Sequence, residues 1–390
     1  MSGHAGTVPV GRWVTIALLS AGFLSYVDRA TLAPMLTVVA QALDTTPAAV
    51  AGALSAYSFA YAAAQLPWGM IATRVRQLTV LSISAGMTLV GAILTTVAWD
   101  LPSLVVGRII VGVALAAIVP GVLVTIGDTM APKERGVAAV HRATALAMAL
   151  AVGTVLASVA ASVGQWRLAF VAIAVMALPL TVVFAVVARR TPPVRRAGIL
   201  ASASLLARSP LAIGILVLCV VEGTVVLGVF NFLPAALEDQ GVDVLFAGLT
   251  IAAFGLAVLA SGPIARALLH RVPQPSIFLI AGGAIAAAFA LLLVHLSVVT
   301  VVIASVLLGF SWAFGHTQTQ VWMTEAVPRA RQFAMALYAI AMFGGAAIGT
   351  ALGAIALTGH SFVPLFAASI VLAVLFGIGA ALLRRRYSLH

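Results

Sequence analysis

The sequence predicts an all-α integral membrane protein with twelve transmembrane helices in two pseudo-symmetric six-helix bundles. Hydrophobic residues make up 63% and charged residues 8% of its 390 residues, whereas a soluble domain carries roughly 25% charged residues. Apolar stretches of about 20 residues or more recur along the chain, and this length crosses a bilayer core as a helix. The strand alternation of a membrane β-barrel is absent. The composition therefore excludes soluble enzymes and disordered proteins.

Each expected span is an apolar stretch bounded by a polar, Gly- or Pro-containing turn. In chain order they are residues 13–39, 48–72, 78–98, 102–128, 137–163, 167–188, 211–237, 245–269, 276–296, 297–326, 333–357 and 362–383.

The loop charges predict the orientation of these spans. Lys and Arg residues fall almost entirely on the side that holds both termini, and only Arg167 lies on the other side. Asp44, Asp100 and Glu238 are among the acids on that second side. Because basic loops stay in the cytoplasm, we expect both termini to be cytoplasmic, in the inner (plasma) membrane.

A basic linker divides the chain into two similar halves. We expect one six-helix bundle over residues 1–188, a cytoplasmic linker over 189–210 and a second bundle over 211–390. The spacing from Gly112 to Asp128 equals that from Gly309 to Glu325, and each acid is followed by Pro and basic residues. Two such halves are typical of transporters with a substrate site between them.

Charges inside the expected spans are the candidate functional groups. A charge there costs roughly 2.5–3.5 kcal/mol, so it usually faces a partner or a water-filled cavity. Counting from Trp13, Asp28 lies roughly 22 Å deep, and Arg108 lies roughly 9 Å below the opposite face, so the two depths coincide. We expect Asp28 to pair with Arg108 or Arg29 and to break the pair on protonation, since Arg does not release its proton. The alternative is a permanent ion pair that fixes helix packing.

Other polar residues in the spans form a second set of candidates. Glu222, near mid-depth, is a further proton-coupling candidate, although a protonated carboxyl bonded to a neighbouring helix is an equal alternative. Aromatic and amide residues at helical spacing are expected to line the substrate cavity, with packing and interhelical bonding as alternatives. The cavity candidates are Arg29, Tyr57, Tyr61, Gln65, Asn231, Trp312 and His316, and the cytoplasmic gate candidates are Arg74, Asp128, Arg135, Glu325 and Arg331.

Three short motifs stand at the ends of expected spans. They are Gly69-Met70-Ile71-Ala72-Thr73-Arg74-Val75-Arg76-Gln77, then Asp128-Thr129-Met130-Ala131-Pro132-Lys133-Glu134-Arg135-Gly136, then Gln165-Trp166-Arg167-Leu168-Ala169-Phe170. Together they resemble motifs of the major facilitator superfamily. The resemblance implies a twelve-helix transporter that works by alternating access. Thr73 stands where that family usually has a gate Asp, so the usual gate chemistry is in question. The first span is similar to that of drug and metabolite exporters, and 26–29 also resembles organic-anion symporters and lipid carriers.

The other sequence features limit the energy source, cofactors and partners that we expect. No nucleotide-binding Gly-rich loop occurs, so an ion gradient must supply the energy if transport is active. Cys219 is the single cysteine, and we expect no metal, no cofactor and no nucleic-acid partner. We expect a monomer in membrane lipid that exports a small amphipathic drug or metabolite in exchange for protons. The alternatives are proton-coupled uptake of an organic anion or a lysolipid-like molecule, and a non-transporting receptor or scaffold.

Overall fold

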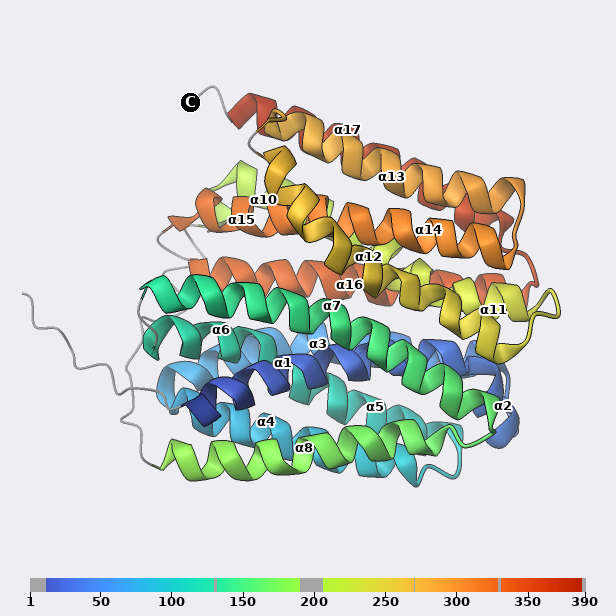
Figure 1. The fold of residues 1–390 in the computed structure, drawn as a ribbon, viewed down its shortest axis with the longest axis horizontal. Coiled ribbons are helices and arrows are strands. Elements are labelled where there is room, and N and C mark those ends of the chain that lie inside the picture. The colour runs from blue at the N-terminus through green and yellow to red at the C-terminus, as the bar shows by residue number, and fades with distance from the viewer. Residues whose placement is uncertain (1–11, 130–131, 190–205, 270, 329–330, 388–390) are drawn as a thin grey trace, which may run out of the picture.

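The computed structural model describes residues 12–129, 132–189, 206–269, 271–328 and 331–387. Within these ranges the chain is almost entirely helical, and no β-strand occurs. The helices run roughly parallel or antiparallel along the long axis of the molecule (Figure 1). The first part of the chain contains α1 (Arg12–Thr31), η1 (Ala33–Met35), α2 (Leu36–Ala42), α3 (Pro47–Arg74), α4 (Gln77–Thr96), α5 (Leu101–Leu115), α6 (Ile118–Thr129), α7 (Pro132–Ser162) and α8 (Arg167–Ala188).

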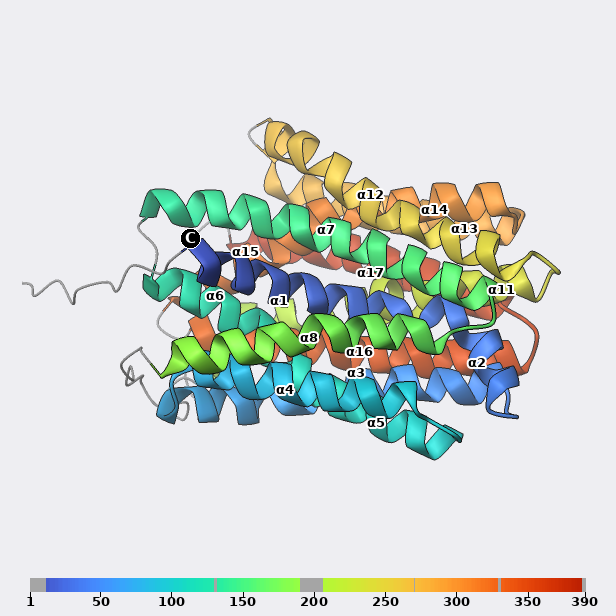
Figure 2. The same ribbon diagram turned by 60° about the horizontal axis from the view of Figure 1, so that its bottom comes forward.

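The second part of the chain continues the same pattern. It contains α10 (Pro210–Glu222), η2 (Gly223–Gly228), η3 (Val229–Phe232), α11 (Leu233–Glu238), α12 (Val244–Leu269), α13 (Gln274–Val294), α14 (Val298–Ser311), η4 (Trp312–His316), α15 (Thr317–Ala326), α16 (Arg331–Thr358) and α17 (Val363–Tyr387). The elements α1–α8 lie together as a first helix group, and α10–α17 lie beside them as a second (Figures 1 and 2).

Eleven helices of the described chain are long and apolar enough to cross a membrane, and each coincides with a predicted span to within a few residues. The predicted span 48–72 also forms a helix, the 28-residue α3, but it does not belong to these eleven. Its Tyr57, Tyr61 and Gln65 are polar in part, and all three are buried inside the protein. The count of twelve spans therefore stays a prediction, as does the division at 189–210, most of which lies outside the described residues.

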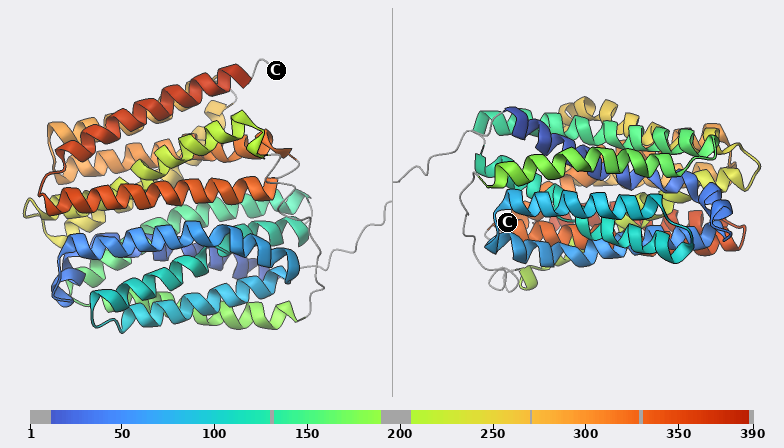
Figure 3. Two further views of the ribbon diagram at one scale, coloured as in Figure 1. Left: turned by 180° about the vertical axis from the view of Figure 1, so that it is seen from behind. Right: turned by 90° about the horizontal axis from the view of Figure 1, so that it is seen from below.

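The two ends of the molecule differ. One end holds the start of α1, the end of α3, the start of α4 and the end of α17, and we call it the terminal end (left in Figure 1, right in the left panel of Figure 3). The opposite end, the loop end, holds the turns before α3, α5, α8 and α14. The exposed side chains of Arg74 and Arg208 lie at the terminal end.

Four of the spans are interrupted. The first breaks after Thr31 at η1, which contains Pro34, and the fourth breaks between α5 and α6. The seventh contains the π-helical η2 and the tenth contains the π-helical η4. Such breaks free backbone groups and often mark functional sites in membrane helices. At the break in the fourth span, Gln65 donates to the Ala116 carbonyl at 3.3 Å and Trp68 donates to the Val113 carbonyl at 2.7 Å.

The two helix groups touch most closely toward the loop end. There α3 packs against α16 and α7 packs against α12, and Ser55 Oγ donates to the Ala347 carbonyl at 3.4 Å. A Cβ atom on Gly255 of α12 would lie 2.7 Å from the Ala147 carbonyl of α7, so only glycine permits this approach. Small residues at such contacts let membrane helices meet at short range.

Candidate functional site

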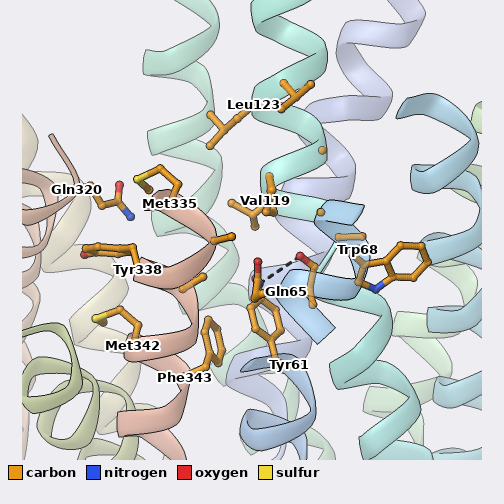
Figure 4. Close-up of a pocket in the computed structure, with 18 of the residues that line it drawn as sticks. Tyr61, Gln65, Trp68, Val119, Leu123, Gln320, Met335, Tyr338, Met342 and Phe343 are labelled. Atoms are coloured by element: carbon orange, nitrogen blue, oxygen red, sulfur yellow. Dashed lines mark hydrogen bonds between the residues drawn. The ribbon is translucent and has the colours of Figure 1, made fainter. Parts of the chain in front are cut away.

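A central cavity of about 350 Å³ lies between the two helix groups. On α3 its walls include Tyr61, Gln65 and Ala72 but no residue from the loop-side half of that helix. On α16 they run from Met335 to Phe343, again only the half nearer the terminal end. The cavity therefore occupies the terminal half of the molecule, while the loop-side halves of α3 and α16 pack on each other. Figure 4 shows side chains of α16 facing those of α3 and α6 across this space.

Aromatic rings and amides dominate the deep part of the cavity. Tyr61 of α3 stacks on Phe343 of α16 with ring centroids 3.7 Å apart, so this pair joins the two groups. Trp312 stacks on His316 at the same centroid distance. The volume falls within the usual range of small-molecule sites, which are mostly apolar with a few polar groups that orient the ligand. The walls suit an amphipathic solute.

Asp28 and Arg108 form a fully buried ion pair beside the cavity. Arg108 Nη1 lies 2.7 Å from Asp28 Oδ1 and Arg108 Nη2 lies 2.9 Å from Asp28 Oδ2, a bidentate arrangement. The side chains are 0% and 1% exposed for Asp28 and Arg108. The guanidinium also lies over the rings of Tyr57 and Phe170, with 4.8 and 5.4 Å to their centroids. The expected pairing of Asp28 with Arg108 is thus present, and it joins α1 to α5.

Arg29 turns away from this pair and toward the cavity. Its guanidinium lies 4.7 Å from the Tyr26 ring centroid, 4.4 Å from that of Phe343 and 5.8 Å from that of Tyr61. Its Nε atom is buried without a hydrogen-bond partner. Among the described cavity residues the charged side chains are Arg29 and Arg142, with no carboxylate. Aromatic faces, rather than an acid, therefore surround this cation.

A second polar cluster lies in the other helix group. His316 lines the cavity, and its Nδ1 atom is 2.9 Å from the Tyr338 hydroxyl and 3.6 Å from Glu222 Oε1. Its Nε2 atom is 2.9 Å from Gln320 Nε2. Glu222 is 2% exposed, and its Oε2 atom has no hydrogen-bond partner. The cluster joins the π-helical breaks, because Glu222 directly precedes η2 and His316 ends η4.

The predicted cavity residues lie in three places. Tyr61, Gln65, Arg29, Trp312 and His316 line the central cavity. Asn231 lines a side pocket of about 50 Å³ that shares Arg29 and Trp312 with the cavity, and its amide donates to the Leu227 carbonyl at 2.7 Å. Tyr57 was expected to line the cavity, but it lies outside the cavity wall. Its side chain is 3% exposed and covers the Arg108 guanidinium.

The expected gate contacts are not made by the described side chains. Arg74 is exposed, and Glu325 pairs with Arg384 at 3.4 Å within the second helix group rather than across to the first. The side chains of Asp128, Arg135 and Arg331 lie outside the described residues. A physical reason for the difference at Glu325 is that the cavity wall extends to Ala72 and Gln77 near this end, so the described parts of the two groups lie apart there.

Sequence reasoning missed three residues of the site. Tyr338 contacts His316, Phe343 closes the deep end of the cavity, and Arg142 lines it with a buried, unpartnered Nε atom. A tyrosine in an apolar span is a detectable signal, because its hydroxyl needs a partner when buried. Nothing in the sequence distinguishes Phe343 from the other phenylalanines of the spans.

Comparisons with known proteins agree with this architecture. Residues 18–331 match the family model of the Major Facilitator Superfamily. The chain is 27% identical over 374 residues to a "Probable sugar efflux transporter" of Haemophilus influenzae strain Rd, covering 92% of this chain and 90% of that protein. A protein of the same name from strain PittGG is 27% identical over 365 residues, covering 90% and 88%.

Two solved structures have the same fold at low sequence identity. The POT family transporter PepTSo aligns with a TM-score of 0.78 and 13% identity, covering 98% of this chain and 99% of that one. A peptide transporter POT in complex with sulfate aligns with a TM-score of 0.79 and 14% identity, covering 97% of both chains. The chain belongs to the major facilitator superfamily, and is a multi-pass membrane transporter of small molecules rather than an enzyme.

Proposed function

We propose that this protein is a proton-driven exporter of a small, hydroxyl-rich amphipathic solute such as a sugar or glycoside. It works by alternating access as a monomer in the lipid of the inner membrane, with both termini in the cytoplasm. The printed names of its relatives support efflux of a sugar. The aromatic and amide walls of the cavity support the same class, because ring faces and hydrogen-bonding groups together suit a sugar ring.

The observation that carries the coupling proposal is the buried bidentate pair of Asp28 and Arg108. Only the carboxylate of such a pair can take up a proton, because the guanidinium stays charged. Protonation removes the ionic part of both hydrogen bonds, so Arg108 loses its counter-charge and keeps its contacts with the faces of Tyr57 and Phe170. Breaking a buried pair costs roughly 3–5 kcal/mol. That amount is enough to shift an equilibrium between two conformations by more than a hundredfold.

The position of Asp28 on α1 connects this event to the cavity. The next residue, Arg29, and the neighbouring Tyr26 both line the cavity. Residues one apart on a helix point about 100° away from each other, so Asp28 faces α5 while Arg29 faces the solute. A shift of α1 against α5 on protonation would therefore move cavity walls that contact Phe343 of the other group. The cavity in this conformation is accessible from the terminal end, which we assign to the cytoplasm.

Purified protein in liposomes with a pH-sensitive dye in the lumen tests the proposal. An outward-directed gradient of a neutral sugar or glycoside should draw protons into the lumen as the solute leaves. Asp28→Asn should lower the number of protons that move per solute, while solute exchange continues. Absence of solute-dependent proton movement in the wild type would refute proton coupling, and proton movement along with the solute would refute exchange.

A second candidate function is proton-coupled uptake of an organic anion or a lysolipid-like molecule. It is favoured by the two guanidinium groups, Arg29 and Arg142, in a described cavity wall that has no carboxylate. Counterflow separates the two candidates when a neutral glycoside is compared with the matching glucuronide, which differs by one carboxylate. Preference for the glucuronide that disappears in Arg29→Gln would favour uptake of an anion. The exposed Arg208→Gln, which removes the same charge outside the cavity, is the matched control.

A further inference from the structure

The proton-coupling pair lies in the first helix group, yet the second group holds its own buried acid beside a basic side chain. Glu222 and His316 come from the seventh and tenth spans, whereas Asp28 and Arg108 come from the first and fourth. Each of these four spans is interrupted near its charged residue. The two arrangements thus occupy corresponding spans of the two halves.

Glu222 is placed where its charge is poorly compensated. Its side chain is 2% exposed, and Oε2 has no hydrogen-bond partner, while Oε1 lies 3.6 Å from His316 Nδ1. The other titratable groups at the cluster are Cys219 and Tyr338, both buried. A buried carboxylate with one bare oxygen is costly when charged, unless a neighbouring cation or a proton compensates it. Among the described residues near it, His316 is the group that can supply that cation.

His316 connects the buried carboxyl group to the cavity. One ring nitrogen, Nδ1, faces the buried Glu222 and the hydroxyl of Tyr338, and the imidazole itself forms part of the cavity wall, as Tyr338 does. The ring is fixed by stacking on Trp312. The other nitrogen, Nε2, faces Gln320, which also lines the cavity. An imidazole with one nitrogen on each side is the usual arrangement for passing a proton between two environments.

We propose that Glu222 and His316 together bind one proton that the solute displaces, so that two protons exchange for each solute. In the loaded form the imidazole carries hydrogen on both nitrogens and pairs with the Glu222 carboxylate. In the unloaded form Nε2 has released its proton to cavity water, and Nδ1–H donates toward Glu222. The charge of Glu222 is then uncompensated, which favours renewed uptake of a proton when the solute leaves. The bare Nε2 then accepts a hydrogen bond from a hydroxyl of the solute in place of its contact with Gln320.

Competition at Nε2 gives exchange a direct chemical basis. A solute hydroxyl can donate to Nε2 only when that nitrogen carries no proton. A proton and the solute therefore exclude each other at this atom, which is the requirement for exchange rather than joint transport. This inference rests on the proposed function, because it assumes that the cavity is the transport site and that Asp28 provides the first proton.

The proton-to-solute ratio tests the proposal directly. Liposomes with a fixed gradient of a neutral glycoside are exposed to a series of membrane potentials and pH differences. The combination at which the net glycoside flux is zero gives the number of protons exchanged per solute. The wild type should give two protons per solute, and Glu222→Gln and His316→Gln should each give one. Glu325→Gln, the same change in an exposed side chain at the terminal end, should stay at two.

The outcomes separate this proposal from the one on which it rests. A ratio of one in the wild type, unchanged in Glu222→Gln, would overturn the second site while leaving proton-driven exchange intact. A ratio of zero in the wild type would overturn both. Direct binding gives a second readout: lowering the pH should weaken glycoside binding in the wild type and should weaken it less in His316→Gln. An equal pH effect in both proteins would contradict competition at His316.

Discussion

Replacing Asp28 with Asn separates the ionic role of this residue from its shape. Asn is nearly isosteric, keeps one acceptor oxygen for Arg108 and cannot change its charge. The pair is buried on both sides and joined by bonds of 2.7 and 2.9 Å, so the change leaves a guanidinium without a counter-charge inside the protein. Removing one partner of such a pair costs roughly 3–5 kcal/mol. We expect a loss of about 3 kcal/mol in the free energy of unfolding, because Asn retains one hydrogen bond.

A double variant measures how much of that loss is the unpaired charge. Asp28→Asn with Arg108→Gln removes the buried cation as well, and should be more stable than Asp28→Asn alone by about 1 kcal/mol or more. Asp44→Asn, in the exposed turn before α3, is the matched control and should change stability little. Chemical unfolding in detergent followed by Trp fluorescence provides the measurement.

The transport consequence of Asp28→Asn follows from the same geometry. Uphill transport driven by an imposed pH gradient should fall well below the wild-type rate, because Asp28 no longer carries a proton to release. Exchange of labelled for unlabelled solute, which needs no gradient, should continue. Uphill transport at wild-type rates in folded Asp28→Asn protein would refute the reasoning from the ion pair.

Three further substitutions probe separate parts of the structure. Gly248→Val should favour separation of the two helix groups at the loop end, because a side chain there would collide with Ser158 of α7. Solute exchange, measured by counterflow, should therefore be slower than in the wild type. Phe343→Ala removes the ring stacked on Tyr61, and should weaken solute binding roughly 2- to 10-fold in a Trp-quenching titration. Asp100→Ala should lower the melting temperature at neutral pH, because Asp100 caps α5 by accepting from the Ser103 backbone amide at 2.9 Å.

The controls for these substitutions differ. Gly262→Val, at a glycine with open space around it, should leave exchange unchanged, and equal slowing would contradict the contact argument at Gly248. Unaltered affinity in Phe343→Ala would exclude the ring from the binding site. The hydrogen bonds from Ser103 hold the pKa of Asp100 below its ordinary value of 3.8. The capping contribution is therefore present at neutral pH and lost as the pH falls through that lowered pKa. A stability difference that persists in strong acid would contradict it.

Much of the fold could be predicted because the bilayer constrains sequence strongly. Helix lengths and boundaries follow from apolar stretches, and eleven of the predicted spans have matching helices in the described chain. Arg108 was one of the two partners expected for Asp28, since a depth count along two helices placed it at the same level, while Arg29 stayed an alternative. Burial of both charges then followed from the cost of leaving either one unpaired.

The remaining features depend on three-dimensional packing. At η2, Gly223 and Gly345 let the seventh span and α16 approach each other at backbone distance, and at η4, Gly315 lies against Ala281 of α13. Sequence periodicity does not reveal such contacts. Tyr57 lies on the same helical face as Tyr61 by spacing, yet it covers Arg108 because α5 approaches α3 closely at Gly112. Glu325 pairs with Arg384, a contact between α15 and α17 that spacing along the sequence does not reveal.

We propose that the protonation state of Asp28 decides which end of the cavity is open. Spin labels are attached at Arg74→Cys and Val321→Cys in protein that also carries Cys219→Ser. Pulsed electron paramagnetic resonance then measures the distance between the two labels, which reports how far apart the two helix groups lie at the terminal end. In labelled protein that keeps Asp28, the distribution of label distances should differ between pH 8 and pH 5. In the same protein with Asp28→Asn, the distribution should be the same at both pH values. An equal pH-dependent shift with and without Asp28→Asn would contradict the account.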